Sequence, residues 1–173
     1  GSTSMLFKKE GLGTYKSPRL EEAYPGIMFS QFMGAEMLVK KYGFTREDLD
    51  RFALESHQKA KAATESGAFA NEIVGVEVET PEGNIIHSSD EGIRFDASME
   101  SLSAVKLLQE GGSITAANAS QICDGASAVL IVSERALKEH GLTPRARIVN
   151  LTVTAGDPVI MLEAPLPATQ HAL

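Results

Sequence analysis

The stretch that decides the fold is residues 111–132, which reads GGSITAANASQICDGASAVLIV. Two glycines open it and a short β-prone run follows. Small residues then alternate with side chains that can hydrogen-bond nearby backbone groups. Residues 126–132 form an apolar run of the length and character of a strand that is buried on both faces. The pattern therefore predicts a loop of small side chains that a core strand holds in place.

Small side chains have a chemical use in such a loop, because they let a ligand approach the backbone closely. An exposed serine or asparagine beside them can hydrogen-bond that ligand. Periodicity alone leaves two interpretations open: a ligand-binding loop, or an ordinary connection that leads into a core strand.

A resemblance favours the first interpretation. Residues 115–120 read TAANAS and residues 124–126 read DGA, and together they resemble the thiolase pattern T-A-G-N-A-S-x-x-N-D-G-A. The sequence departs from this pattern twice, with Ala117 at a glycine position and Cys123 at an asparagine position. Thiolases are CoA-dependent acyltransferases of fatty acid metabolism that make or break the carbon–carbon bond of 3-ketoacyl-CoA. The resemblance implies this activity for the parent protein, with CoA as a substrate and no covalently bound cofactor.

The resemblance also implies which residues contact CoA. Ser120 matches the serine that contacts the pantetheine arm, and Ala116 matches a backbone position that packs beside that arm. Arg94 matches an arginine at the nucleotide end of CoA, where one planar guanidinium can bind phosphate or stack on adenine. The alternative for Arg94 is a surface ion pair with Asp90 or Asp96.

Two neighbouring residues match positions near the acyl group. Met33 matches a residue that lines the acyl pocket, although helical spacing alone is also typical of a core methionine. Phe32 stands where biosynthetic members often carry histidine, which removes a polar group near the thioester. Degradative and biosynthetic directions therefore both stay open, as does the acyl chain.

No catalytic residue is predicted in this chain. The nucleophilic cysteine of the family lies before the segment that residues 1–5 resemble, and the N-E-A-F, G-H-P and C-x-G motifs lie after the region that residues 165–168 match. The only cysteine, Cys123, is expected to be a small buried side chain. The four histidines are scattered, so neither a metal site nor a Cys–His pair is predicted. We therefore expect the segment alone to be inactive.

The predicted fold class is α/β: part of a thiolase-like layered fold, mostly a helical insertion domain with a small hairpin, plus two core strands. Thr45 is predicted to cap a helix that reaches about Ser66, with Arg46 and Asp50 on a solvated face. The predicted units are residues 1–5 as the end of a core strand (or a vector-derived leader), residues 6–112 as the insertion or loop domain, and residues 113–173 as an incomplete return to the N-terminal half. The predicted elements are a loop over 8–25, helices over 31–42 and 98–108, a hairpin over 72–86, strands over 126–132 and 145–154, a helix from Ser133 to Gly141, and a helix start at 168–173.

Composition excludes several classes of partner. The 173 residues carry a net charge of −7 and a pI near 5.1, which argues against nucleic acid and anionic membrane as partners. No apolar run approaches the length of a membrane span, no signal peptide is expected, and a single cysteine suits a reducing compartment. We therefore expect a cytoplasmic protein, with organelle import left open, whose partners are acyl-CoA or CoA, the rest of a thiolase chain, and other copies in a homodimer or homotetramer.

Two further functions remain as alternatives. The chain could be a non-catalytic CoA or acyl-CoA binding module that stands alone, or a structural or assembly segment that binds no small molecule. In isolation, residues 126–132 and 145–154 would expose apolar edges, so self-association is expected.

Overall fold

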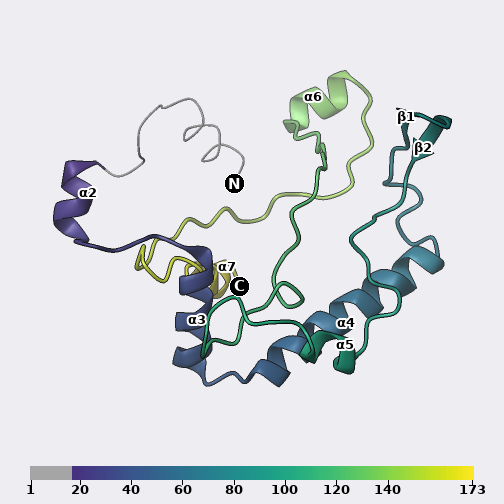
Figure 1. Cartoon of the computed structure of the whole chain (residues 1–173). Coiled ribbons are helices and arrows are strands. Elements are labelled where there is room, and N and C mark those ends of the chain that lie inside the picture. Colours follow the sequence, from purple (N-terminus) through teal and green to yellow (C-terminus); the bar gives the residue numbers. More distant parts are fainter. Residues whose placement is uncertain (1–16) are drawn as a thin grey trace.

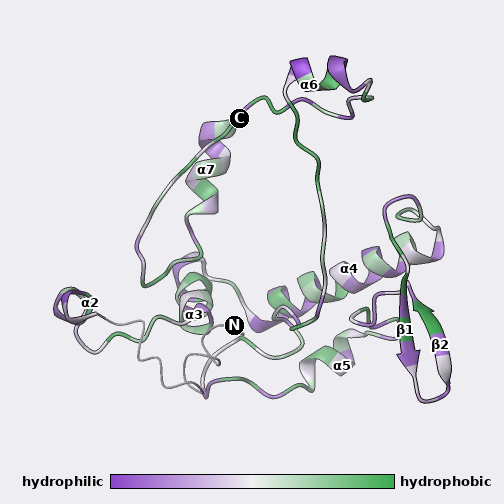
Figure 2. Cartoon of the chain, turned by 90° about the horizontal axis from the view of Figure 1, so that it is seen from above, coloured by the Kyte–Doolittle hydropathy of each residue, from purple (hydrophilic) through white to green (hydrophobic). Residues whose placement is uncertain are grey.

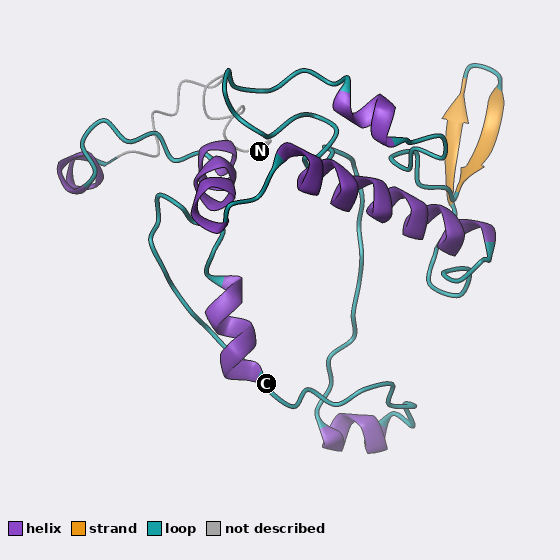
Figure 3. Ribbon diagram, turned by 90° about the horizontal axis from the view of Figure 1, so that it is seen from below, coloured by secondary structure: helices purple, strands orange, loops and turns teal. Residues whose placement is uncertain are grey.

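The computed structural model describes residues 17–173 (Figure 1), so the strand end predicted at residues 1–5 and the first part of the predicted loop domain lie outside the described residues. Figure 3 shows α4 with α3 beyond its N-terminal end and the hairpin beyond its C-terminal end. The elements are α2 (Pro18–Ala23), α3 (Gln31–Tyr42), α4 (Arg46–Glu65), β1 (Val76–Thr80), β2 (Gly83–His87), α5 (Met99–Ser103), α6 (Glu134–Glu139) and α7 (Pro165–Ala172).

Local signals define the junction between α3 and α4, as predicted. Gly43 ends α3 with φ of 70°, a left-handed conformation that suits glycine. Thr45 caps α4 in a capping box: its hydroxyl oxygen accepts the Asp48 amide, and the Asp48 carboxylate accepts the Thr45 amide. The hydroxyl of Thr45, and then its amide, donate to the Asp48 carboxylate and lower the pKa of that group below its ordinary value.

The predicted hairpin is present and shorter than expected. Strands β1 and β2 pair antiparallel, with Val76 opposite His87 and Thr80 opposite Gly83. Gly83 has φ of 120°, a backbone conformation that L side chains rarely adopt, which explains the glycine at the end of the turn. The pairing starts at Val76 and not at residue 72.

The two predicted core strands do not form. The hairpin is the only sheet among residues 17–173, and residues 126–132 and 145–154 run as extended, unpaired segments. Val153 is 94% exposed and Leu130 is also exposed. Figure 2 shows the segment before α6 as a hydrophobic stretch that stands apart from the helices. An apolar run can predict burial, but a strand also needs a neighbour to complete its hydrogen bonds, and the described residues supply none.

Two helix predictions need correction at their ends, and one loop prediction missed a helix. Helix α5 stops at Ser103 and not near residue 108. The predicted loop over 8–25 contains α2, which Ser17 caps and in which proline takes the first position. Helix α7 starts at Pro165 and not at residue 168, because a proline is tolerated in the first helical turn, where its missing N–H has no partner. In the described part of the chain, no helix is long and apolar enough to cross a membrane.

The end of α3 is tied to the segment before α7 by a carboxylate. The ammonium group of Lys41 lies 2.6 and 2.8 Å from the two carboxylate oxygens of Glu163, and the Tyr42 hydroxyl donates to the same carboxylate. The hydrogen bond from Lys41, followed by that from Tyr42, lowers the pKa of Glu163 below its ordinary value of 4.5. The same contact with Glu163 raises the pKa of Lys41.

Acid is therefore expected to loosen this contact. A carboxylate whose pKa is lowered by folding stabilises the fold above its ordinary pKa of 4.5, and that contribution is lost as the pH falls through the folded pKa. The Glu163→Gln variant should show reduced amide protection in α7 at neutral pH and no further loss of this kind in acid. Hydrogen exchange, corrected for intrinsic rates, measures both effects. Glu134→Gln, which removes an exposed pair within α6, is the control and should leave α7 protection unchanged.

Candidate functional site

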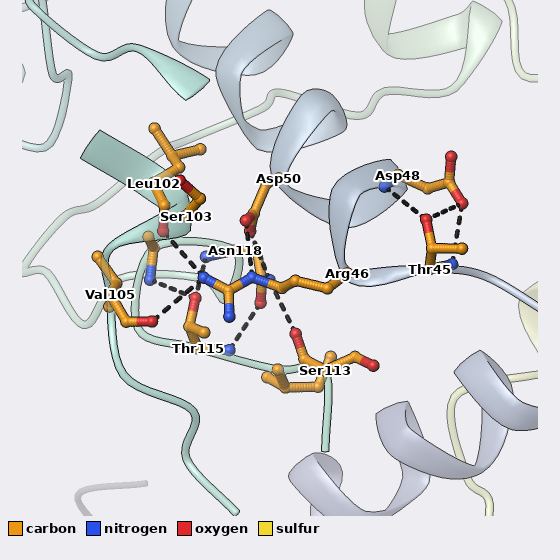
Figure 4. Close-up of polar contacts among 12 residues, drawn as sticks. Thr45, Arg46, Asp48, Asp50, Leu102, Ser103, Val105, Ser113, Thr115 and Asn118 are labelled. Atoms are coloured by element: carbon orange, nitrogen blue, oxygen red, sulfur yellow. Dashed lines mark hydrogen bonds and ion pairs between the residues drawn. The ribbon is translucent and has the colours of Figure 1, made fainter. Parts of the chain in front are cut away.

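A buried polar cluster lies under the small-residue loop, residues 113–120. Asp50 on α4 is 1% exposed and Thr115 in the loop is 0% exposed. One carboxylate oxygen of Asp50 lies 2.6 Å from Nε of Arg46, and the other accepts a hydrogen bond of 2.9 Å from the Asn118 amide group. Figure 4 shows these side chains pointing toward one another between α4 and the loop. The cluster therefore attaches the loop to the first two turns of α4.

The cluster also includes the end of α5. The Arg46 guanidinium donates from Nη2 to the carbonyl oxygens of Leu102 at 2.9 Å and Val105 at 3.2 Å. The prediction that Arg46 and Asp50 belong to a solvated face is therefore wrong. Helix α5 and the loop cover that part of α4, so its charged groups must be paired to be buried at low cost.

The loop satisfies its own backbone groups. The Thr115 amide donates to Asn118 Oδ1 at 2.8 Å, while the Thr115 hydroxyl oxygen accepts the amides of Ala117 and Asn118 at 3.1 and 3.2 Å. Asn118 Nδ2 also donates to the Ser113 carbonyl at 3.1 Å. Among described non-glycine residues only Met161 has a positive φ, so Ala117 needs no left-handed backbone where the family pattern has glycine. The result is a turn held in one conformation by side chain to backbone bonds.

Helix α3 reaches the same loop through one carboxylate. Glu36 accepts the amides of Ser113 and Ile114, each at 2.8 Å. Phe32 and Met33 lie one helical turn before Glu36, and both are exposed. Their exposure excludes a core role for Met33 within the described residues. The two predicted acyl-contacting residues are thus linked to the loop through α3.

The predicted CoA contacts in the loop are accessible. Ser120 and Ala116 are both exposed, and they lie in the loop that contains the buried Thr115. The neighbour of Ser120, Gln121, donates from Nε2 to the carbonyl oxygen of Gly92 at 2.8 Å. This hydrogen bond joins the Ser120 loop to the segment that carries the predicted nucleotide contact.

That segment, residues 90–97, is held against α4. The Arg94 amide donates to Nδ1 of His57 at 3.2 Å. The side chain of Arg94 is exposed, and no ion pair joins it to Asp90 or Asp96 in the described part of the chain. The surface ion pair considered for Arg94 is therefore not formed. The guanidinium group is available for a ligand.

Sequence reasoning missed four residues that build this site: Arg46, Asp50, Glu36 and His57. Arg46 and Asp50 carry opposite charges four residues apart. The exposed pair Arg51–Glu47 has the same spacing on the same helix, so spacing alone does not distinguish the two pairs. Cys123 is exposed, so its prediction as a buried side chain is wrong.

Two hollows lie along the second half of α3, and the first is lined in part by Glu36 and Ser113 of the site. One of about 390 Å³ lies between α3 and residues 109–113, and one of about 690 Å³ lies between the end of α3 and residues 156–170. None of the five predicted binding residues lines either hollow. Within residues 17–173, no group of three or more His, Cys, Asp or Glu side chains could hold a metal ion.

Comparisons with known proteins agree with one another. Residues 14–135 match the family model described as thiolase, N-terminal domain. The chain is 47% identical over 160 residues to a steroid 3-ketoacyl-CoA thiolase of Mycobacterium tuberculosis, covering 92% of this chain and 38% of that protein. It is 44% identical to the mitochondrial 3-ketoacyl-CoA thiolase of Mus musculus, covering 82% of this chain and 36% of that protein.

Solved structures give the same result. The acetyl-CoA acetyltransferase of Bacillus anthracis matches with a TM-score of 0.80 and 39% identity, over 86% of this chain and 38% of that one. Human mitochondrial 3-ketoacyl-CoA thiolase matches with a TM-score of 0.74 and 40% identity, over 81% of this chain and 37% of that one. The chain therefore spans less than two fifths of the length of these relatives, and the likeness confirms an α/β fold class of this type.

Proposed function

Because this chain belongs to the thiolase family, we propose that it forms the CoA- and acyl-binding part of a thiolase-type acyltransferase. The reaction of the parent protein is thiolysis of a 3-ketoacyl-CoA by CoA, which gives acyl-CoA and acetyl-CoA, or the reverse condensation. Its covalent chemistry needs an activated thiolate and donors aimed at the oxyanion, and these groups lie in other parts of the protein. We propose the same homodimer or homotetramer that was expected from the sequence.

The observation that carries the proposal is the exposed Ser120 hydroxyl on an otherwise anchored loop. Thr115 and Asp50 are buried and Asn118 bonds to both, so these hydrogen bonds hold the loop in one conformation without a ligand. A preorganised loop avoids the entropic cost of ordering on binding. Ala116, also exposed, offers a small side chain beside which a pantetheine arm can lie.

The Arg94 segment supports the nucleotide half of the proposal. A protein with a net charge of −7 needs a local cation to bind the polyanionic CoA. Arg94 is exposed. Its segment is joined to the Ser120 loop by the hydrogen bond from the Gln121 side chain to the Gly92 carbonyl. Phe32 and Met33 supply exposed apolar surface near the start of α3 for the acyl chain.

The proposal predicts two losses of CoA affinity in the complete protein. Ser120→Ala removes one neutral hydrogen bond and should raise the Kd for CoA about threefold to tenfold. Arg94→Ala removes a charge-assisted contact and should raise the Kd about tenfold to a hundredfold. Isothermal titration with CoA measures both. Arg51→Ala, which removes an exposed arginine on α4, is the matched control and should leave the Kd unchanged.

The same measurements separate the alternative functions. Unchanged CoA affinity in both variants would refute the assignment of these residues. Exchange of labelled CoA into acyl-CoA distinguishes an enzyme from a non-catalytic CoA-binding module. A complete protein that binds no CoA would instead be a structural or assembly component.

A further inference from the structure

We propose that His57 positions the CoA-binding arginine by holding the backbone of Arg94, and that it does so only as a neutral imidazole. The inference rests on the function proposed above for Arg94. His57 is half-buried on the middle turns of α4, and its Nδ1 atom accepts the Arg94 amide at 3.2 Å. The hydrogen bond joins His57 to the backbone of Arg94 and not to its guanidinium group, so its role is to position Arg94.

The Arg94 segment is held at both of its ends. Toward its start, the Gly92 amide donates to Asp90 Oδ1 at 2.7 Å and the Gly92 carbonyl accepts from Gln121 at 2.8 Å. On the other side, the ammonium group of Lys61, one turn after His57 on α4, donates to the Phe95 carbonyl at 3.2 Å. His57 supplies the contact between these two, at the residue whose side chain is proposed to bind the nucleotide.

Protonation must disrupt the His57 contact. A backbone amide can only donate, so Nδ1 must carry a lone pair, which places the proton of the neutral ring on Nε2. In the imidazolium form both ring nitrogens are donors, and two N–H groups then face each other. The charged groups on α4 nearest His57 in the sequence are Glu55, Lys59 and Lys61, of which Lys59 pairs with Glu55 and Lys61 with Glu65; those in the loop are Asp90, Glu91, Arg94 and Asp96.

A pH series on the complete protein tests the proposal. CoA titrations at about pH 7.5 and about pH 5.5, on either side of the ordinary range of imidazoles, test for an effect of acid on binding. His57→Asn places an amide oxygen in the place of Nδ1, and this oxygen accepts at both pH values. His57→Ala removes the acceptor. His140→Asn, at the exposed end of α6, is the control.

We expect His57→Ala to weaken CoA binding about tenfold at the higher pH, with KM for CoA raised and kcat unchanged. The wild type and His140→Asn should lose about tenfold more affinity than His57→Asn between the two pH values. Titration of the CoA phosphate groups falls in the same range and is common to the wild type and His57→Asn. The difference between wild type and His57→Asn therefore isolates His57.

Hydrogen exchange of residues 90–97 without CoA provides a test that is independent of ligand binding. His57→Ala should lose protection there, whereas His57→Asn should keep it at both pH values. Identical pH profiles for wild type and His57→Asn, or unchanged protection in His57→Ala, would overturn the proposal. If Arg94→Ala alone has no effect on CoA affinity, the proposed function fails while the exchange result still decides the His57 contact. If His57→Ala does not fold, the comparison of the pH profiles of CoA affinity between the wild type and His57→Asn decides whether the proposal holds.

Discussion

Replacement of Asp50 by alanine is expected to lower the free energy of unfolding by about 3–5 kcal/mol, because it leaves the Arg46 charge without its buried partner. Asp50 is 1% exposed, and its two oxygens accept from Arg46 and from Asn118. Loss of the carboxylate also leaves the Asn118 amide group without an acceptor, which adds the cost of an unsatisfied buried donor. The Ser120 loop should lose its anchor at the same time.

Urea denaturation of the complete protein, with the transition followed in this region by hydrogen exchange, measures the effect. The matched control is Arg51→Ala, which breaks an exposed pair with Glu47 on the same helix and should cost about 0.5 kcal/mol or less. Combining Asp50→Ala with Arg46→Met should recover part of the loss, since no uncompensated charge then remains buried. A cost for Asp50→Ala no larger than that for Arg51→Ala would contradict the assignment of a buried cluster.

Replacement of Gly34 by alanine is expected to destabilise the protein by about 1–3 kcal/mol, although alanine is the better helix former by about 1 kcal/mol. A Cβ atom at Gly34 would lie 2.5 Å from the carbonyl oxygen of Ile160 and 3.3 Å from its carbonyl carbon. Both atoms belong to the backbone, and Ile160 is buried beside Met161, whose φ of 44° is already unfavourable. Neither Ile160 nor Met161 can move aside without displacing their backbone segment from α3.

Thermal unfolding measures this cost. Gly125→Ala is the control, because no atom lies within 4 Å of its added Cβ and its backbone is not left-handed, so its effect should be near zero or slightly stabilising. Gly34 follows Phe32 and Met33 directly on α3. Displacement of the Ile160 segment from α3 should therefore also alter acyl-chain preference more than CoA affinity. Equal melting temperatures for the wild type and Gly34→Ala would show that the segment can move away from α3.

The elements that short-range chemistry governs were predictable. Gly43 and the Thr45–Asp48 capping box mark the helix ends because each involves residues no more than a few positions apart. The hairpin follows from a turn between two short strands, and Ser133 caps α6 by the same local rule. The family pattern predicts the small-residue loop, in which Ser120 is exposed; its contact with CoA stays a prediction.

Strand formation in residues 126–132 and 145–154 was predicted wrongly for a general reason. A helix completes its hydrogen bonds within one segment, whereas a strand completes them only with a neighbour. The apolar character of both runs was correct, and their exposure in the described chain follows from the absence of a neighbouring strand there. In the longer relatives, the chain corresponds to less than two fifths of the whole.

The sequence by itself determined the family, the junction between α3 and α4, the hairpin and the small side chains of the loop at residues 113–120, because these depend on residue identity and on contacts between near neighbours. Tertiary structure alone decided which arginine of α4 pairs with a buried carboxylate, since the bond between Asn118 and Asp50 joins residues 68 positions apart. It also placed His57 against Arg94, 37 positions away. Such contacts depend on how helices and loops pack around one another, and that packing is a property of the whole chain that no local spacing encodes.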